Sequence, residues 1–303
     1  MNRKTILSMN FPDFLAKWNT YYHNYRQTDY WCITSDYCLD DKDKPNDVMT
    51  FSIFPVYNIN TLKDDVQKSL PKDIKEIKNI SEKAISYIES CPYVFSIVLI
   101  IENKNEIFDL EGSKKRLDDL IKSMENWPKA KKDEFIHKIK LFRKYLDRKQ
   151  INRKLLSNIS ITVHTMSVII EFLLLKTNIK HITWISDRDS ITNFQNNGII
   201  HLLVRQGFAN LVRNRIQDNQ IYGILDDGKY NPELLDDLVR IPDYISGSVA
   251  SMDFENPENV HEKDYELFDK ALADNEKVYF MHLKHNQSGD TLSNINFTRV
   301  NNS

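Results

Sequence analysis

Hydrophobic and polar residues follow two different periods along the chain, and together these periods predict a mixed α/β protein. Runs rich in β-branched and aromatic residues predict strands at residues 30–39, 48–56, 93–101 and 181–186, with a last strand at 277–283. Apolar residues at helical spacing predict helices at residues 11–28, 158–176 and 199–216, with another from Pro242, and one or two surface helices broken at Pro71 within residues 61–90. We therefore expect a mixed sheet with flanking helices.

The segments between the strands predict how the strands pair. Residues 41–47 form a short polar connection, so the strands on either side are expected to be an antiparallel pair. The strand at 93–101 is almost continuously apolar, which is typical of burial on both faces in the centre of a sheet. The helix at 158–176 leads into the strand at 181–186, an order that favours a parallel strand.

A strongly basic segment occupies residues 114–154, where 15 Lys and Arg stand against 6 Asp and Glu. Its apolar spacing predicts an amphipathic helical pair broken at Pro128. A solvated helix surface is the commoner explanation of such a charge run, and a phosphate-contacting arm is the functional alternative. If the second alternative holds, nucleic acid binds through these helices.

Composition narrows the classes of function. The formal net charge of the whole chain is −2, which argues against a wholly basic nucleic-acid binder. The three cysteines, Cys32, Cys38 and Cys91, form no Cys-x-x-Cys motif, so we expect neither a disulfide framework nor a cysteine-rich zinc site, and a cytoplasmic location fits best. The 7 glycines do not have the spacing of a Walker or dinucleotide-binding loop. We expect no signal peptide and no membrane span.

Three aspartates stand beside apolar or β-branched residues that belong to a core: Asp36 in the first strand, Asp187 at the end of the fourth and Asp243 on the late helix. Holding a charge there is costly unless something compensates it, and divalent cations bound by converging carboxylates are one such device. Each aspartate also has an ordinary explanation. Asp36 is then an exposed strand residue, and Asp187 caps a turn. Asp243 is then an acid at the start of a helix, where the helix dipole stabilises a negative charge.

This order of elements and acids resembles the ribonuclease H-like superfamily, and within it an uncharacterised bacterial family with an acidic first strand and a late helix of the type Leu-Ala-Asp-hydrophobic-hydrophobic-Ala-Gly. The motifs that carry the resemblance are Ser35-Asp36, Trp184-Ile-Ser-Asp187-Arg-Asp189 and Arg240-Ile-Pro-Asp243-Tyr-Ile-Ser-Gly247-Ser-Val-Ala. The resemblance covers residues 30–252 with helical insertions. The usual Asp-Glu-Ser-Gly of the first strand is absent.

The resemblance implies a nuclease that uses two divalent cations, Mg²⁺ or Mn²⁺, about 4 Å apart. Asp36 would bridge both ions, while Asp187 and Asp243 would each complete one site. Asp40, two strand periods beyond Asp36, is a second choice for the first-strand ligand, although a turn residue is the commoner explanation. Glu171 is a further candidate from the helix before the fourth strand, with a solvent-reaching rim residue as its alternative.

Other residues are weaker candidates. Arg188 and Arg205 would contact phosphate or form ordinary ion pairs. The aromatic residues near the N-terminus would stack on bases or, more often, form core: Trp18, Tyr21, Tyr22, Tyr25, Tyr30 and Trp31.

We expect a single ribonuclease H-like domain over residues 1–303, with helical insertions at 61–92 and 113–157. Its expected function is metal-dependent hydrolysis of phosphodiester bonds in RNA or DNA. A catalytically inactive scaffold or recognition subunit of a phage-defence or mobile-element system is the first alternative, and the irregular first-strand motif favours it. A small-molecule phosphohydrolase is the second. A protein partner or a homo-oligomer is compatible with each of them.

Overall fold

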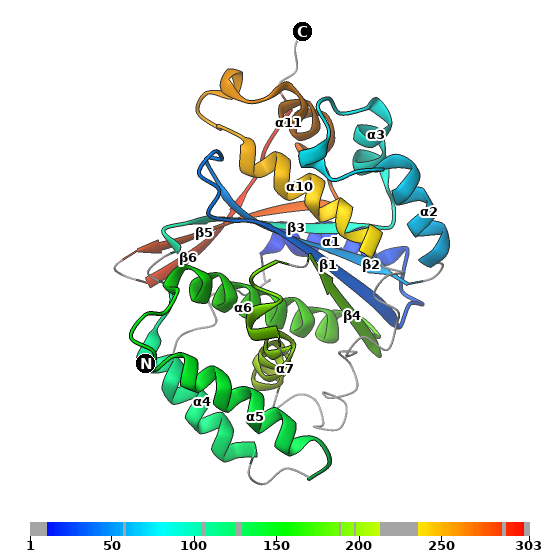
Figure 1. The fold of residues 1–303 in the computed structure, drawn as a ribbon. Coiled ribbons are helices and arrows are strands. Elements are labelled where there is room, and N and C mark those ends of the chain that lie inside the picture. The colour runs from blue at the N-terminus through cyan, green and yellow to red at the C-terminus, as the bar shows by residue number, and fades with distance from the viewer. Residues whose placement is uncertain are drawn as a thin grey trace. The chain divides into compact units, whose positions relative to one another are not determined.

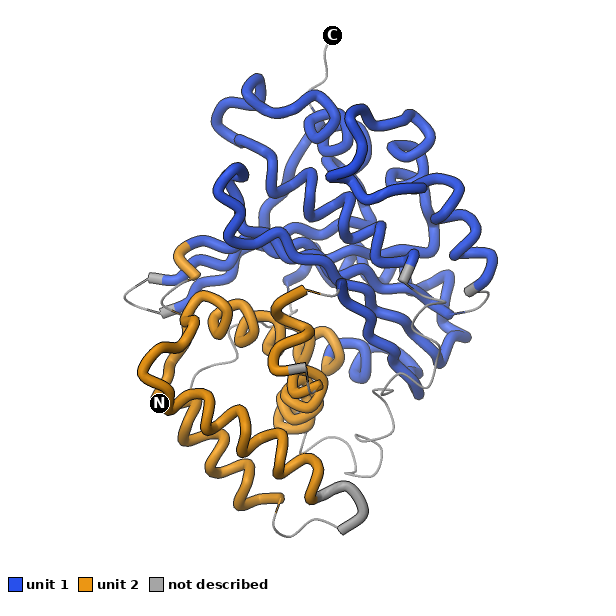
Figure 2. Tube along the Cα trace, in the orientation of Figure 1, with its two compact units in different colours: residues 1–102, 172–187, 217–303 blue, residues 103–171, 188–216 orange. Residues whose placement is uncertain are grey.

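The computed structural model describes residues 11–56, 59–104, 107–124, 129–187, 189–196, 198–212, 236–286 and 289–299. The chain divides into two compact units (Figure 2). The first unit comprises residues 1–102, 172–187 and 217–303, and the second comprises residues 103–171 and 188–216. Residues 61–92 therefore belong to the first unit, and residues 113–157, the expected basic insertion, belong to the second.

The first unit is built on a six-stranded mixed sheet with the order β4-β1-β2-β3-β5-β6. The strands are β1 (Tyr30–Cys38), β2 (Asp47–Pro55), β3 (Phe95–Glu102), β4 (His181–Ser186), β5 (Val278–Asn286) and β6 (Gly289–Ile295). β1 pairs antiparallel with β2 and parallel with β4, while β3 pairs antiparallel with β2 and parallel with β5. The predicted hairpin, the central third strand and the parallel fourth strand are confirmed. β6, which pairs antiparallel with β5, was not predicted.

Helices cover both faces of this sheet. One face carries α10 (Arg240–Ser251), together with α2 (Ile59–Ser69), α3 (Glu82–Ser90) and α11 (Glu262–Leu267) (Figure 1). Short helical segments accompany them: η1 (Ile74–Glu76), η4 (Asp236–Val239), η5 (Pro257–Asn259) and η6 (Phe268–Leu272). The core beneath α10 includes Val98 of β3, Ile185 of β4 and Phe280 of β5. Because side chains alternate along a strand, this core fixes which residues of β1 face α10.

The opposite face packs against α1 (Pro12–His23). Trp18 is fully buried, with its ring edge-on to Phe95 and Phe172 at centroid distances of 5.3 Å each. Trp31 is also fully buried beside Trp18. Four of the six aromatic residues near the N-terminus therefore form core, which is the commoner of the two alternatives that the sequence left open, whereas Tyr22 and Tyr30 are half-buried.

The second unit is helical. It contains α4 (Leu110–Met124), α5 (Lys129–Tyr145), the N-terminal part of α6 (Arg153–Lys176), η3 (Phe194–Asn196) and α7 (Ile199–Val212). α4 and α5 pack against each other and bury Leu117, Leu120 and Phe142. The predicted amphipathic pair is thus present, whereas its break at Pro128 lies outside the described residues.

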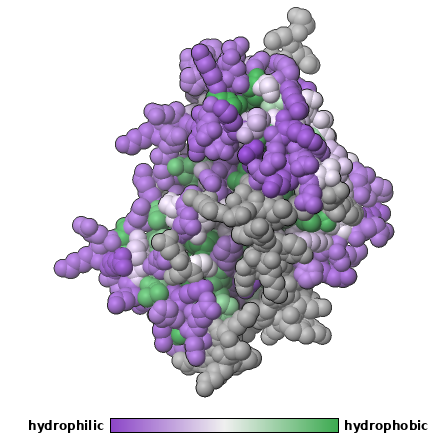
Figure 3. All heavy atoms as spheres, turned by 45° about the vertical axis from the view of Figure 1, so that its right-hand side comes forward, coloured by the Kyte–Doolittle hydropathy of each residue, from purple (hydrophilic) through white to green (hydrophobic). Residues whose placement is uncertain are grey.

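α6 is long and apolar enough to cross a membrane by length and composition alone. Its most apolar window has a mean hydropathy of 1.6, and 67% of that window is buried inside the structure. Burial of this extent is typical of a core helix in a soluble protein. Apolar side chains also stay dispersed on the described surface seen in Figure 3, where green areas are small and separated.

Candidate functional site

The register of two parallel strands places Asp36 and Asp187 side by side. Ser35 of β1 lies opposite Ser186 of β4, so the next residue of each strand is one of the two aspartates. The backbone N–H of Asp187 continues the ladder by donating to the Ser35 carbonyl oxygen at 3.1 Å. Both aspartates are therefore fixed at the same end of adjacent strands.

The helix α10 brings the third aspartate to these strands. Asp243 lies in the first turn of α10, and Ser246 follows one turn later. The Ser246 hydroxyl donates to Oδ2 of Asp36, while its oxygen also lies 3.3 Å from the Asp243 carbonyl oxygen. Since Asp243 and Ser246 are neighbours on one helix face, this hydrogen bond places Asp36 beside the N-terminal turns of α10.

Burial and mutual repulsion raise the pKa of two of these carboxyl groups. Asp36 is 8% exposed, and its pKa rises to about 7, first through desolvation and then through the charges of Asp243 and Asp187. Desolvation is also the main reason why the pKa of Asp243 rises to about 6, and Asp187 adds to it. The three aspartates are thus electrostatically coupled. We call Asp36, Asp187 and Asp243 the aspartate cluster.

A short turn of the first unit supports Asp243. The backbone N–H of Ile74, in η1, donates to Oδ2 of Asp243 at 2.9 Å, which favours the ionised carboxylate. Asp73 raises the pKa of Asp243 by its negative charge, and Lys75 lowers it by its positive charge. The Asp243 carboxylate therefore accepts a hydrogen bond from a different segment of the chain. Its position at the start of α10, where the helix dipole favours an acid, is not its only structural role.

The aspartate cluster suits a hard divalent cation by its chemistry, because all its donors are carboxylate oxygens. Repulsion among these carboxylates, of which Asp36 is buried and Asp243 half-buried, is also what a bound cation would relieve. As placed, no three His, Cys, Asp or Glu side chains within the described ranges are arranged to hold an ion. Asp187 is the exposed member of the cluster, at the end of β4.

Asp40 lies apart from the strand on which we expected it. β1 ends at Cys38, and Asp40 is an exposed residue of the following turn with φ at 60°. Its backbone N–H donates to Oδ1 of Asp47 at 2.6 Å, which closes the turn. The expectation that Asp40 shares the strand face of Asp36 was wrong, because the chain turns before the strand period reaches it. Aspartate tolerates this left-handed conformation better than most residues do.

The remaining candidates belong to the second unit. Glu171 lies half-buried on α6, and Arg205 is buried on α7. Oδ1 of Asp189 accepts the backbone N–H groups of Ile191 and Thr192 at 2.9 Å each, so Asp189 caps a turn. Arg188 lies outside the described residues. The metal-binding role of Glu171 therefore stays a prediction.

Sequence reasoning missed Ser246 and the η1 turn. Ser246 stands three residues after Asp243, and this spacing on one helix face is a signal that was available. Ile74 carries no such signal, because it contributes only its backbone N–H, which any residue except proline has.

The basic helices α4 and α5 neutralise part of their own charge. Arg143 bonds Asp118 at 3.0 Å and Asp147 at 2.6 Å, and Lys114 lies 3.3 Å from Asp147. Other lysines of these helices and the turn after them are exposed: Lys115, Lys122, Lys140, Lys144 and Lys149. These exposed lysines are available to a phosphate backbone.

Reversing Lys140 and Lys144 to Glu tests the phosphate-contacting arm. If α5 contacts nucleic acid, a plot of log affinity against log salt concentration should have a less negative slope in the variant, by about 1 to 2. Each lost phosphate contact removes about 0.9 from the slope. A fluorescence binding titration at several salt concentrations measures this. Reversal of Lys42 and Lys176, exposed lysines of the first unit outside residues 61–92, is the control. An equal effect of both pairs would return α5 to the solvated-surface explanation.

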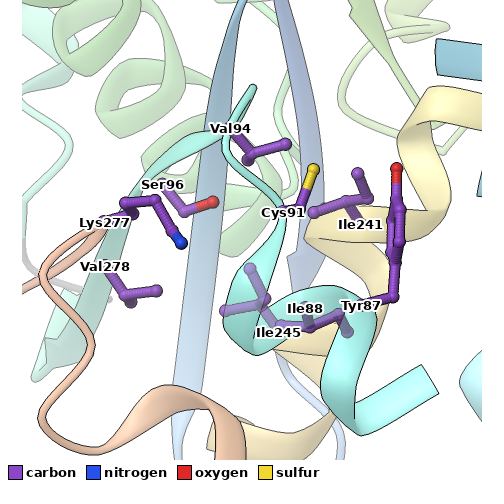
Figure 4. A pocket seen from close by; sticks show the side chains of 9 residues that line it. All are labelled: Tyr87, Ile88, Cys91, Val94, Ser96, Ile241, Ile245, Lys277 and Val278. Atoms are coloured by element: carbon purple, nitrogen blue, oxygen red, sulfur yellow. The ribbon is translucent and has the colours of Figure 1, made fainter. Parts of the chain in front are cut away.

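Two hollows of the first unit lie outside the aspartate cluster. A pocket between α3, β3 and α10 is lined by residues that include Cys91, Ile241 and Lys277 (Figure 4). Its volume of about 10 Å³ suffices for roughly one water molecule, so it is no substrate site. A cleft of about 380 Å³ lies between α1 and the C-terminal strands, and none of the three aspartates lines it.

Comparison of the chain with protein-family models, with curated proteins and with solved structures gave no significant match.

Proposed function

We propose that the protein is a metal-dependent nuclease of ribonuclease H-like architecture. One observation carries the proposal: the parallel pairing of β1 with β4, together with the packing of α10, gathers three aspartates that are far apart in the sequence into one coupled cluster. The strand order supports the proposed architecture, because three antiparallel strands are followed by a fourth that is parallel to the first.

The residues of the cluster have distinct roles in this proposal. Asp36, which is central and buried, would bridge two cations, while Asp187 and Asp243 would each complete one site. Bound Mg²⁺ or Mn²⁺ would supply an activated water and would stabilise the leaving oxygen. Ser246 orients Asp36 through its hydroxyl, and the Ile74 N–H orients Asp243. Without a cation, the raised pKa of Asp36, about 7, leaves this carboxyl group partly protonated near neutral pH.

An inactive scaffold or recognition subunit, as in phage-defence or mobile-element systems, is the second candidate. The observation that favours it is that the described carboxylates, as placed, do not form a three-ligand set. The departure of the first-strand motif from Asp-Glu-Ser-Gly points in the same direction. An inactive protein of this kind would still bind nucleic acid or a protein partner through the same surface. The cytoplasmic location and a homo-oligomeric state stay predictions.

Cleavage of labelled RNA and DNA in Mn²⁺, Mg²⁺ or EDTA tests the proposal. Asp187→Asn should lower the Mn²⁺-dependent rate by more than about 100-fold, since the loss of an outer-shell partner alone costs 10- to 100-fold. Asp187 is exposed and Asn has nearly the same shape, so we expect the variant to keep the wild-type circular dichroism spectrum and unfolding midpoint, which are measured alongside. Asp40→Asn, a change of the same type in the nearby turn, should leave the rate unaltered.

The outcomes separate the three candidates. Binding of nucleic acid without cleavage in any metal would favour the scaffold. Hydrolysis of free nucleotides alone would favour the phosphohydrolase. Equal rates for the wild type and Asp187→Asn would remove the aspartate cluster from the mechanism.

A further inference from the structure

The η1 turn is held against the aspartate cluster from three directions. Its Ile74 N–H bonds the Asp243 carboxylate at 2.9 Å. Lys263 of α11 donates from Nζ to the carbonyl oxygens of Ile74 at 2.8 Å and of Ile77 at 3.0 Å. The Ile74 side chain, 4% exposed, packs on α10 at Gly247. The backbone of η1 is therefore fixed relative to Asp243.

Lys75 is the next residue of this fixed turn, and its side chain reaches into solvent. The side chain is 76% exposed, and its Nζ lies 3.8 Å from Oδ2 of Asp73. An exposed ion pair at this distance contributes little free energy, so the ammonium group readily exchanges Asp73 for another anion. Lys75 directly follows Ile74, whose backbone N–H bonds Asp243, so the ammonium group lies on the segment that contacts the aspartate cluster, and its charge lowers the pKa of Asp243.

A polyanionic substrate needs such a cation. The carboxylates of the aspartate cluster repel a phosphodiester, and bound cations offset this repulsion most strongly at the phosphate that they contact, because salt screens their charge at the more distant phosphates. A lysine has a flexible side chain and provides a point charge for a neighbouring phosphate. Because its backbone in η1 is anchored, that charge stays beside the aspartate cluster. Asp73 would hold the same ammonium group when no substrate is bound.

We propose that Lys75 binds a backbone phosphate of the substrate beside the aspartate cluster, so that the η1 turn is part of the nucleic-acid site. This inference rests on the proposed function, since it takes the substrate to be a phosphodiester chain. It also gives the helical segment at residues 61–92 a direct role at the site, which the sequence did not indicate.

The test compares Lys75→Gln with Lys72→Gln, both in an Asp187→Asn background that prevents cleavage. Lys72 is an exposed lysine just before the η1 turn, so the two variants lose the same charge on the same segment. The probe is a fluorescent single-stranded oligonucleotide titrated in Mg²⁺ over a range of salt concentrations. Lys75→Gln should weaken binding by about 3- to 10-fold and reduce the salt slope by about 0.7, the value for one phosphate contact on a single strand.

Two further readings sharpen the result. Lys75→Arg should keep the salt slope, because it keeps the charge, and Lys72→Gln should keep both slope and affinity. In the cleaving enzyme, Lys75→Gln should raise KM more than it lowers kcat, as expected for the loss of substrate binding outside the reacting bond. Equal slopes and affinities for Lys75→Gln and Lys72→Gln would overturn the inference.

The inference and the proposed function can fail separately. If the wild type binds the oligonucleotide but never cleaves it, and Lys75→Gln still lowers the slope, the nuclease proposal fails and the role of Lys75 stands. If cleavage depends on Asp187 while Lys75→Gln behaves like the control, the nuclease stands and the role of Lys75 fails. A wild type that binds no nucleic acid overturns both.

Discussion

Asp36→Asn is expected to abolish metal-dependent cleavage and, in the absence of metal, to stabilise the folded protein at pH 8. The loss of cleavage should exceed about 1,000-fold, because the proposed bridging ligand serves both cations and an amide is a poor ligand for a hard ion. The gain in stability has a separate cause. A neutral side chain removes the cost of holding a charge at a buried position beside Asp243 and Asp187.

The pH dependence of this gain follows from the direction of the pKa shift. The folded protein raises the pKa of Asp36 from 3.8 to about 7, so it binds the proton more tightly than the unfolded chain does. The stabilising effect of the protonated form is complete below about pH 4 and is lost as the pH rises to about 7. Asn resembles the protonated form at every pH. The variant should exceed the wild type in free energy of unfolding by on the order of 3 kcal/mol at pH 8 and by little near pH 4.

Urea denaturation at both pH values, in EDTA and in Mg²⁺, measures these differences. Mg²⁺ should stabilise the wild type at pH 8 and have a much smaller effect on Asp36→Asn, since only a ligand that binds the folded state shifts its stability. Asp264→Asn is the matched control. Asp264 is 4% exposed and its pKa is also raised by burial, but it lies at the start of α11 and not in the aspartate cluster. Its substitution should leave cleavage and the Mg²⁺ response intact. An Asp36→Asn variant that still cleaves would contradict the proposed role of this residue.

The sequence predicted the parts of the fold that depend on periodic burial. β1 to β4 are long enough for their apolar pattern to stand out, and a short polar turn joins the first two. Once β4 is parallel to β1, register alone brings Asp36 and Asp187 together. The proximity of Asp36 and Asp187 was therefore predictable from local patterns. The presence of an acid at the start of α10 was predictable in the same way.

Local patterns are weaker signals where tertiary contacts decide the structure. β6 is mostly polar and lies at the edge of the sheet, so it lacks the apolar alternation of a strand with one buried face. Asp40 fits the strand period, but a left-handed turn residue interrupts it. The η1 turn has three residues and no period at all. Its position depends on hydrogen bonds and packing with α10 and α11, which are far away in the sequence.

Gly247→Ala is expected to loosen the η1 turn and to impair the aspartate cluster from a distance. A Cβ atom at Gly247 would lie 2.6 Å from Cγ2 of Ile74, and the glycine is buried inside α10, so Ile74 must move. Overpacking of this kind costs about 1–3 kcal/mol of stability. Cleavage should fall by roughly 10-fold, the lower range for the loss of a group that orients a metal ligand, because the Ile74 N–H shifts away from Asp243.

The effect of Gly247→Ala on stability should change sign when the Ile74 side chain is shortened. In an Ile74→Ala background the clashing methyl group is absent, while the backbone N–H that bonds Asp243 remains. Gly247→Ala should then be neutral or stabilising by up to about 1 kcal/mol, because alanine favours a helix interior more than glycine does. A double-mutant cycle of urea denaturation, run beside the cleavage assay, measures the coupling. If Gly247→Ala destabilises both backgrounds equally, close packing of Ile74 on α10 is not what holds the η1 turn against Asp243.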